Sequence, residues 1–354
     1  MNKSTSATEQ ADLTRLREMS ARIGSDPLLT QASTGNTSMK RDGILWIKAS
    51  GRWMADAIHE DILVPLDLAE VKECVRQRVD PAELHAHASI ETAMHAVLPH
   101  RVVLHVHSVN TIAWAVRQDA KIQLERRLGG LRWQWISYVV SGLPLAHEIE
   151  KVLSAFAGAD VFVLGNHGLV IGGDDCDAVE NLLRQVERRL AICPRPVVAT
   201  DYALLGTIAD RSSWGLPDAG EVHAFGTDAI SRAILSGGLL HPCQSIFSNS
   251  TTPELFRSVP CPDPSNPWES RYCTRPFLII EGRGVIVRRN MTPSQSAMMT
   301  GLAQVVQRIS PSAPLRYLTE KEVEDSSSTI AARYRDVAQN ATTRIPSNRS
   351  QARS

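Results

Sequence analysis

The sequence predicts an α/β protein built from two domains, and three observations support this. The chain has 354 residues, which exceeds the usual size of a single compact core. Hydrophobic residues make up 43% of it and charged residues 21%, as in ordinary globular proteins. Amphipathic helical patterns alternate along the chain with short apolar runs rich in β-branched residues, the mixture expected of an α/β fold.

Charge and cysteine content narrow the function classes. The 38 basic and 38 acidic side chains cancel, so we do not expect a nucleic acid as a partner. The six cysteines are dispersed without a C-x-x-C pair, which favours reduced thiols. The amino terminus lacks the apolar core of a signal peptide, and no segment has 18 uncharged apolar residues in a row. We therefore expect a cytoplasmic protein without a membrane partner.

In the first 195 residues, apolar residues at helical spacing predict helices at 13–23, 68–79, 90–98, 110–116, 147–157 and 178–190. Short apolar runs predict strands at 44–48, 62–66 and 101–107, and two more within 159–173 that join at Gly165–Gly168. Residues 30–40 are predicted to end in a loop of small polar residues. Ser89 is the predicted N-cap of helix 90–98, which places Glu91 in its first turn.

The aromatic residues are concentrated between positions 121 and 140, where Trp133, Trp135 and Tyr138 occur. Buried aromatic side chains usually pack in a core or a subunit interface, and we interpret this region in that way. Tyr138 is also a candidate for contact with a substrate.

Prolines and glycines interrupt the pattern between Cys193 and Gly226, and we predict the domain junction there. Beyond it the sequence predicts a helix at 228–235, an extended segment at 239–247, a proline-rich loop at 248–274 and a hairpin around Gly282–Gly284. Thr292 is the predicted cap of a further helix, and 330–337 has a short helical pattern. The predicted divisions are a flexible arm (1–12), a large domain (13–195), a linker (196–225), a small α/β domain (226–320) and a polar C-terminal tail (321–354).

Three histidines are candidate metal ligands. Side chains alternate faces along a strand, so His105 and His107 point the same way at the end of strand 101–107. A catalytic zinc site uses three protein ligands and keeps a fourth position for water or substrate. His167 is the candidate third ligand, because it lies at the turn between two predicted strands and strand ends of one sheet converge. The alternative is that each of these histidines is an ordinary core residue.

Glu91 is the candidate acid/base, and its alternative role is compensation of the helix dipole. His95 lies one turn after Glu91 and is expected at most to orient that carboxylate. His85 and His87 also form a His-x-His pair, but they fall in a predicted loop and are weaker candidates. No dinucleotide-binding glycine motif follows a strand, and no P-loop or Gly-x-Ser-x-Gly elbow occurs, so nicotinamide, nucleotide-triphosphate and serine-hydrolase chemistry lose support.

Loops rich in glycine, serine, asparagine and threonine flank the strand at 44–48. Such backbone can bind an anion through its N–H groups, but the same residues are the commonest turn formers. The loops are therefore candidates for a phosphate site or for ordinary turns.

Five segments occur in the order and approximate spacing of the class II aldolase/adducin family, which the chain resembles over residues 10 to 195. They are Gly35–Ser38, Ala49–Gly51, Ser89–Glu91 with Met94–His95, His105–His107 and Asn166–Gly168. That family includes zinc-dependent fuculose- and rhamnulose-phosphate aldolases, ribulose-phosphate 4-epimerases and methylthioribulose-phosphate dehydratase. Leu239–Pro242 and Arg316–Thr319 are similar to the segment that follows the aldolase module in longer members fused to a dehydrogenase.

The resemblance implies a fold and roles for site residues. The 13–195 domain would be the catalytic domain, an α/β/α sandwich with a mainly antiparallel central sheet, and the smaller C-terminal α/β domain would follow it. Metal ligands by position are His105, His107 and His167, for Zn²⁺ or another divalent cation, and Glu91 matches the proton shuttle. Positions that line the phosphate pocket are Asn36, Ser50, Gly51 and Ser89. Many aldolases have a second serine where this chain has Ile90, which removes a hydroxyl from that pocket.

The activity that the resemblance implies is that of a metal-dependent aldolase, an aldehyde-lyase. It would cleave a ketose or ketose phosphate by a retro-aldol reaction through a metal-bound enediolate, with Glu91 transferring the proton. Epimerisation or dehydration at the same metal is the first alternative, and a non-catalytic, adducin-like assembly module is the second. The resemblance also implies a homo-oligomer, with four subunits, whose partner is a small sugar or sugar phosphate.

Overall fold

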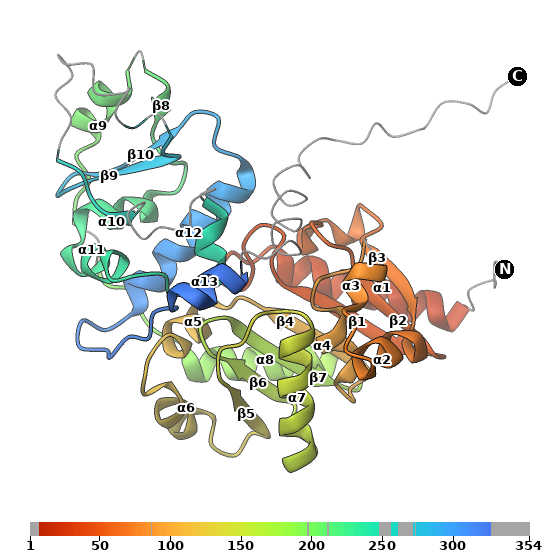
Figure 1. Cartoon of the computed structure of the whole chain (residues 1–354). Coiled ribbons are helices and arrows are strands. Elements are labelled where there is room, and N and C mark those ends of the chain that lie inside the picture. The colour runs from red at the N-terminus through yellow and green to blue at the C-terminus, as the bar shows by residue number, and fades with distance from the viewer. Residues whose placement is uncertain are drawn as a thin grey trace, which may run out of the picture.

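The computed structural model of the chain describes residues 7–85, 87–196, 198–210, 212–247, 256–260, 272 and 274–326. Two sheets organise these residues, one of seven strands in the N-terminal part and one of three strands in the C-terminal part (Figure 1). The strand order in the first sheet is β3-β2-β1-β4-β7-β6-β5, and β5 and β6 are its one parallel pair. The α/β expectation with a mainly antiparallel sheet is therefore confirmed. The strands are β1 (Asn36–Arg41), β2 (Ile44–Lys48), β3 (Leu63–Asp67), β4 (Val102–Val106), β5 (Trp133–Ile136), β6 (Val161–Leu164) and β7 (Gly168–Gly173).

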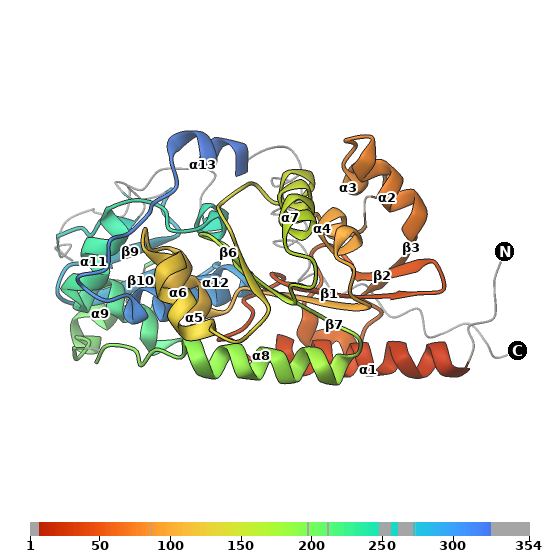
Figure 2. The same ribbon diagram turned by 90° about the horizontal axis from the view of Figure 1, so that it is seen from below.

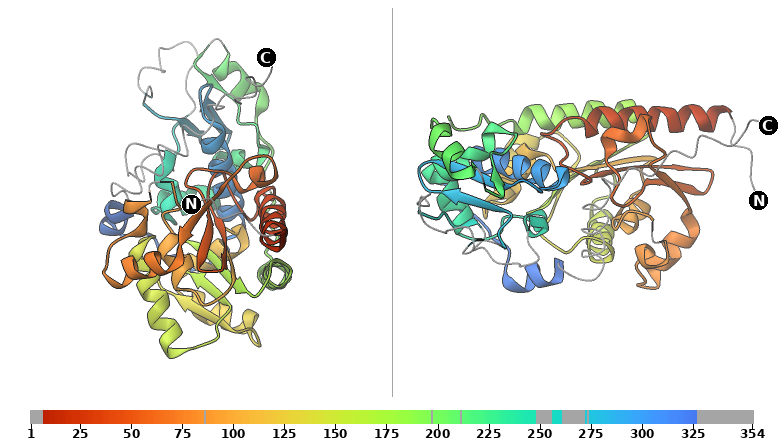
Figure 3. Two further views of the ribbon diagram at one scale, coloured as in Figure 1. Left: turned by 90° about the vertical axis from the view of Figure 1, so that its right-hand side faces the viewer. Right: turned by 90° about the horizontal axis from the view of Figure 1, so that it is seen from above.

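Helices cover both faces of the large sheet. Figure 2 shows α1 and α8 along one face and α2, α3, α4 and α7 on the other, and the same layers are visible in Figure 3. The alternation of β4 explains this, because Val102, Leu104 and Val106 pack with α1 and α8 whereas Val103 packs with α4 and α7. These helices are α1 (Ala7–Gly24), α2 (Leu68–Arg76), α3 (Pro81–Leu84), α4 (Thr92–Val97), α7 (Leu143–Ala155) and α8 (Cys176–Leu190); a short 3-10 helix, η1 (Met54–Ile58), packs on α1.

Three local expectations in this part are corrected. Helix α1 begins at Ala7, so residues 7–12 are helical and not a flexible arm. Residues from Asn36 onward form a strand instead of a loop, because β1 pairs with both β2 and β4. Helix α4 begins at Thr92 and not at residue 90, although the Ser89 hydroxyl does accept the hydrogen bond expected of a cap, from the Glu91 amide (3.2 Å). Glu91 thus occupies the N-cap position without capping, which leaves its carboxylate free to face inward.

The C-terminal part contains a small antiparallel sheet with the order β8-β10-β9. The residues predicted as a linker, 196–225, include α9 and strand β8, which pairs with β10, so they belong to this part of the fold. Segment 239–247 was expected to be extended, but Pro242–Phe247 is a 3-10 helix, η3. The other elements of the C-terminal part are α9 (Tyr202–Ala209), β8 (Trp214–Gly215), η2 (Gly220–His223), α10 (Ala224–Thr227), α11 (Ala229–Ser236), β9 (Phe277–Ile280), β10 (Gly284–Arg288), α12 (Pro293–Arg308) and α13 (Glu320–Ser326).

The predicted hairpin around Gly282–Gly284 and the predicted cap at Thr292 are both confirmed. Helix α13 includes the first residues of the predicted polar tail. The helix expected at 330–337 and most of the loop expected at 248–274 lie outside the described residues. Among the helices that the structure describes, none has the length and apolar composition needed to cross a membrane.

The two parts share a hydrophobic cluster. Val109 and Ile112 of α5 (Val109–Ala115) pack with Leu302 and Val306 of α12. Because α5 begins two residues after His107, the C-terminal part is anchored on the helix that follows the predicted metal ligands. The remaining helix, α6 (Ala120–Leu128), packs against α5 and α8.

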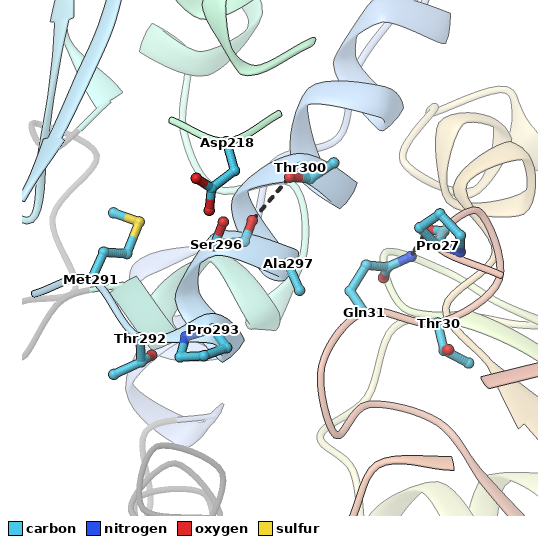
Figure 4. A pocket seen from close by; sticks show the side chains of 10 residues that line it. All are labelled: Pro27, Thr30, Gln31, Asp218, Met291, Thr292, Pro293, Ser296, Ala297 and Thr300. Carbon is cyan, nitrogen blue, oxygen red and sulfur yellow. Dashed lines mark hydrogen bonds between the residues drawn. The ribbon is translucent and has the colours of Figure 1, made fainter. Parts of the chain in front are cut away.

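A cleft of about 410 Å³ lies between the 27–31 loop and the first turns of α12. Figure 4 shows Pro27, Thr30 and Gln31 on one side of it, facing the residues of the C-terminal part. Thr292 lies on the other side and begins α12 with a capping box. Its hydroxyl accepts from the Gln295 amide (3.2 Å), and the Gln295 side chain accepts from the Thr292 amide (3.0 Å).

Substituting Thr292→Ala should lower stability, because the Gln295 amide at the start of α12 loses the hydroxyl that accepts its hydrogen bond. The expected loss is about 1 kcal/mol, seen as a lower midpoint of thermal unfolding. The matched control is Thr300→Ala in the same helix, where the hydroxyl only donates to the Ser296 carbonyl (3.0 Å). The control should leave the midpoint unchanged or raise it, because alanine is the better helix former. Equal midpoints for the two variants would contradict the role given to the cap.

Candidate metal centre

Three imidazoles converge where β4 meets the turn between β6 and β7. His105 lies in β4, His107 directly follows this strand, and His167 lies in the turn. Their ring centroids are 4.8–5.1 Å apart, and one ligand atom of each lies within 4.8 Å of the others. Each residue is at most 6% exposed. The structure therefore brings together the three histidines that the sequence singled out, in an arrangement that could hold a metal ion.

Hydrogen bonding assigns the proton on His105. Its Nδ1 lies 3.1 Å from the Leu169 carbonyl oxygen of β7, so Nδ1 carries the hydrogen and Nε2 keeps a lone pair. That Nε2 faces the Nε2 of His107 at 3.1 Å. Two nitrogens bound to one tetrahedral zinc at about 2.0–2.1 Å would lie roughly 3.4 Å apart. The donor set and its spacing thus fit a divalent metal.

The other two imidazoles are held in their neutral form. Burial, with smaller effects of the neighbouring histidines, lowers the pKa of His107 well below its usual value. Burial also lowers the pKa of His167 to about 4, with Glu91 opposing the shift and His105 adding to it. Neutral imidazole is the form that binds a metal, so at pH 7 these ligands have no proton to release.

The turn that presents His167 is fixed by its neighbour. Asn166 adopts a left-handed conformation with φ of +50°, which asparagine tolerates better than most residues. Its side-chain amide donates to the carbonyls of Leu240 and Arg316, each at 2.8 Å, and accepts from the Arg316 guanidinium at 2.9 Å. Segments of the C-terminal part therefore hold the turn in place.

Glu91 bridges two of the three histidines. Its Oε1 lies 3.4 Å from Nε2 of His167, and its Oε2 lies 3.4 Å from Nε2 of His105. The Asn36 amide donates to Oε2 (2.8 Å), and the Ser141 hydroxyl donates to Oε1 (3.3 Å). Burial opposes ionisation, but His105, His167 and the Asn36 hydrogen bond outweigh it and lower the pKa of Glu91 to about 2. The carboxylate is therefore ionised at neutral pH.

Two of the four residues expected at a phosphate pocket, Asn36 and Ser89, form hydrogen bonds with Glu91. Asn36 pairs with His105 across β1 and β4, and its amide also donates to the Ser89 hydroxyl (3.1 Å). The other two, Ser50 and Gly51, form the turn after β2, where the Ser50 amide donates to the His87 carbonyl (2.9 Å). Their loop thus adjoins Ser89. The Asn36 side-chain amide is directed at the Glu91 carboxylate, whereas the Ser89 hydroxyl accepts from Asn36 and from the Glu91 backbone amide.

His95 acts on Glu91 through Asn36 and not directly. Its Nε2 contacts the Asn36 side-chain oxygen, and its Nδ1 lies 2.7 Å from the Ser38 hydroxyl. Burial lowers the pKa of His95 to about 3, so the ring is neutral. His95 therefore orients the amide that in turn holds the carboxylate.

The remaining candidates do not belong to the group of three metal-binding side chains. His85 is part-buried and lies 4.0 Å from Glu70, and His87 is exposed. Tyr138 packs against the hydrophobic cluster shared by the two parts, with the Arg316 guanidinium 5.4 Å from its ring centroid. Its hydroxyl has no hydrogen-bond partner among the described residues, and burial raises its pKa.

Three residues near the site were missed by the sequence reasoning. Lys48 is buried, and its ammonium donates to the carbonyls of Ser33 (3.1 Å), Ala49 (3.3 Å) and Arg52 (2.6 Å). Burial lowers its pKa to about 7. Cys243 places its Sγ 3.3 Å from Nδ1 of His107, and His241 is buried nearby. His241 falls within Leu239–Pro242, which the sequence marked only by its resemblance to longer members, and no local pattern marks Lys48 or Cys243. The positions of all three relative to the site depend on contacts between distant segments.

Comparison with known proteins identifies a shared domain. A family model described as "Class II Aldolase and Adducin N-terminal domain" matches residues 15–193. The chain is similar to "Uncharacterized oxidoreductase YuxG" of Bacillus subtilis (strain 168), with 28% identity over an alignment of 174 residues that covers 43% of this chain. The match covers only 25% of that relative's length.

Solved structures with similarity to the chain include the N-terminal class II aldolase domain of a conserved protein from Thermoplasma acidophilum. The match has 23% identity and a TM-score of 0.45, and it covers 54% of this chain and 97% of that one. A second is l-fuculose-1-phosphate aldolase from Thermus thermophilus, with 16% identity, a TM-score of 0.37, and coverage of 51% and 91%.

A side chain at position 168 should disturb the metal centre. A Cβ on Gly168 would lie 2.5 Å from the Val106 carbonyl oxygen and 3.2 Å from His105 Cε1, so β4 and β7 would have to separate. We expect Gly168→Ala to weaken Zn²⁺ binding by about 10-fold or more, measured by competition with a chelating dye. The control is Gly206→Ala in α9, where a Cβ meets no atom within 4 Å. Zinc affinity that is equal in the two variants would contradict this account.

Acid should destabilise the metal-free protein. Burial lowers the pKa of His95, His107, His167 and His241, the last to about 4, whereas an unfolded histidine titrates near 6.5. Between pH 6.5 and about 4 the unfolded chain therefore binds protons that the folded chain does not. As the pH falls through this range, each of these histidines lowers the free energy of unfolding by about 1.4 kcal/mol per pH unit.

The measurement is the urea midpoint at pH 7, 6 and 5 with a chelator present. It should fall steadily toward pH 5. A His241→Leu protein should show a shallower fall, because one of these groups is missing. A midpoint that is constant over this range would contradict the prediction.

Proposed function

The chain belongs to the class II aldolase and adducin family, and from that premise we propose that it is a metal-dependent aldolase acting on a ketose or ketose phosphate. The observation that carries the proposal is the buried triad His105, His107 and His167 with the ionised Glu91 bridging two of its members. An assembly module has no use for a buried carboxylate held against two of three clustered imidazoles, because burying such polar groups is costly unless a ligand is bound.

The residues of the site divide the chemistry between them. The three histidines would hold the divalent cation, and a cation bound there would polarise a substrate carbonyl as a Lewis acid. Glu91, ionised and held by Asn36 and Ser141, would first accept the proton of the substrate hydroxyl whose oxygen becomes the aldehyde carbonyl and then deliver it to the carbon left when the carbon–carbon bond breaks; the reverse direction runs the same two transfers backwards. The burial of the site excludes water from this transfer.

We further propose that the substrate site is lined, on the side of Glu91, by Asn36, Ser50, Gly51 and Ser89. The hydrogen bond from Asn36 to Glu91 Oε2 favours a role for Asn36 in holding the carboxylate, and Ser89 accepts a second hydrogen bond from the same side-chain amide. Ile90, which follows Ser89, is half-buried and offers no hydroxyl. These observations make an unphosphorylated ketose as strong a candidate as a phosphorylated one.

The proposal is tested with metal-loaded protein and a panel of ketose 1-phosphates and free ketoses, with aldehyde products measured by coupled reduction. Cleavage should be detectable, and Glu91→Gln should reduce it by about 10² to 10⁴ while the bound metal stays near one ion per chain. The control is Glu180→Gln, which removes a carboxylate paired with Arg22 (2.8 Å) on the outer helix layer. Turnover in the control should match that of the parent protein.

Each contrary result has a definite meaning. Epimerised or dehydrated sugar without fragments would replace the lyase assignment with one of the alternative reactions at the same site. Full activity of Glu91→Gln would move the proton transfer to another group, with Tyr138 the first candidate. Absence of bound metal by elemental analysis would refute the enzyme proposal.

A further inference from the structure

The segment Leu240–Gln244 of the C-terminal part lies against the metal centre. At one end the Leu240 carbonyl accepts a hydrogen bond from Asn166, the neighbour of His167 (2.8 Å). Near the other end Cys243 Sγ lies 3.3 Å from His107 Nδ1. His241 is thus placed between two contacts that join this segment to the surroundings of two predicted metal ligands.

His241 is buried without a hydrogen-bond partner. It is 6% exposed, and neither Nδ1 nor Nε2 has a partner among the residues that the structure describes. The backbone around it is satisfied, because the Gln244 side-chain oxygen accepts from the amides of Leu240 (2.5 Å) and His241 (3.2 Å). A neutral imidazole carries one donor and one acceptor, and leaving both unpaired in a buried position is costly and rare.

The ring is close to the triad but is not part of it. His241 is near enough to His107 and His167 for their charges to affect one another's pKa, and the contacts of Leu240 and Cys243 hold its segment against the centre. It does not belong to the group of histidines whose ligand atoms lie within 4.8 Å of one another. The His241 imidazole is therefore not needed to bind the metal, and its nitrogens are available to hydrogen-bond a substrate held at the triad.

We propose that His241 is a substrate-binding residue whose imidazole hydrogen-bonds a hydroxyl or carbonyl oxygen of the sugar held at the triad. This rests on the proposed function, and it adds that the C-terminal part supplies a contact to the substrate. The ligand class is a polyhydroxylated carbonyl compound, since such a molecule has oxygen atoms beyond those that face a cation. The unpaired donor and acceptor of His241 would then both be satisfied by the substrate or by water that it orders.

The test uses the full chain loaded with Co²⁺ and glycolohydroxamate as the probe. Its hydroxamate oxygens chelate a divalent cation, and its free hydroxyl mimics the next oxygen of a sugar. Probe binding is read from the visible spectrum of the cobalt and from calorimetry, so no turnover is needed. We expect His241→Leu to keep Co²⁺ and weaken the probe by about tenfold, the loss of one hydrogen bond. His241→Asn, which keeps a donor and an acceptor, should recover part of this affinity.

Stability provides a second readout. Removing an unpaired imidazole should leave the thermal midpoint of His241→Leu unchanged or raise it. The matched control is His223→Leu, a buried histidine of the same part whose Nδ1 accepts from the Val285 amide (3.1 Å). The control should lower the midpoint and leave the affinity for the probe unchanged.

Unchanged probe affinity in His241→Leu would overturn the inference while leaving the proposed function intact. Loss of Co²⁺ from this variant would also overturn it, because His241 would then be a metal ligand. A parent protein that binds neither Co²⁺ nor the probe would refute the proposed function, and the inference with it.

Discussion

Gly168 lies against the Val106 carbonyl where β4 and β7 run side by side, with room for no larger residue. This close approach lets the Leu169 carbonyl accept the Nδ1 hydrogen of His105, which turns the Nε2 lone pair toward His107. The turn that precedes Gly168 delivers His167 to the same place. The spacing, tautomer and burial of the triad thus all depend on how closely two neighbouring strands pack.

A second level of control comes from the C-terminal part. Asn166 connects the turn at His167 to the Leu240 and Arg316 carbonyls, which are 74 and 150 residues away in sequence. Helix α12 packs on α5, the helix that follows His107. Both sides of the triad are therefore supported by residues outside the aldolase domain. A change in the packing of the C-terminal part would be transmitted to the metal centre through these contacts.

Local sequence signals predicted most of the helices and strands, but they did not predict the strand at Asn36 or the start of α4. The Asn36 region was expected to be a loop because its residues are small and polar, yet pairing on both sides makes it a strand. Ser89 was expected to cap a helix from residue 90; its hydroxyl makes the local bond to the Glu91 amide and accepts a second bond from Asn36, while the helix begins only at Thr92. In both cases a non-local partner adds to or overrides the local preference, and both place polar groups beside Glu91.

The sequence alone determined the His105-x-His107 pairing, because alternation along a strand is a local property of the backbone, and it identified His167 and Glu91 through their motifs. The tertiary structure decided how these groups meet: Glu91 lies 3.4 Å from two imidazoles, and His95 acts through Asn36. It also brought in His241, Cys243 and Lys48, which no spacing or periodicity marks. Cys243 contacts a histidine 136 residues earlier in the chain, and only the packing of the two parts creates that contact.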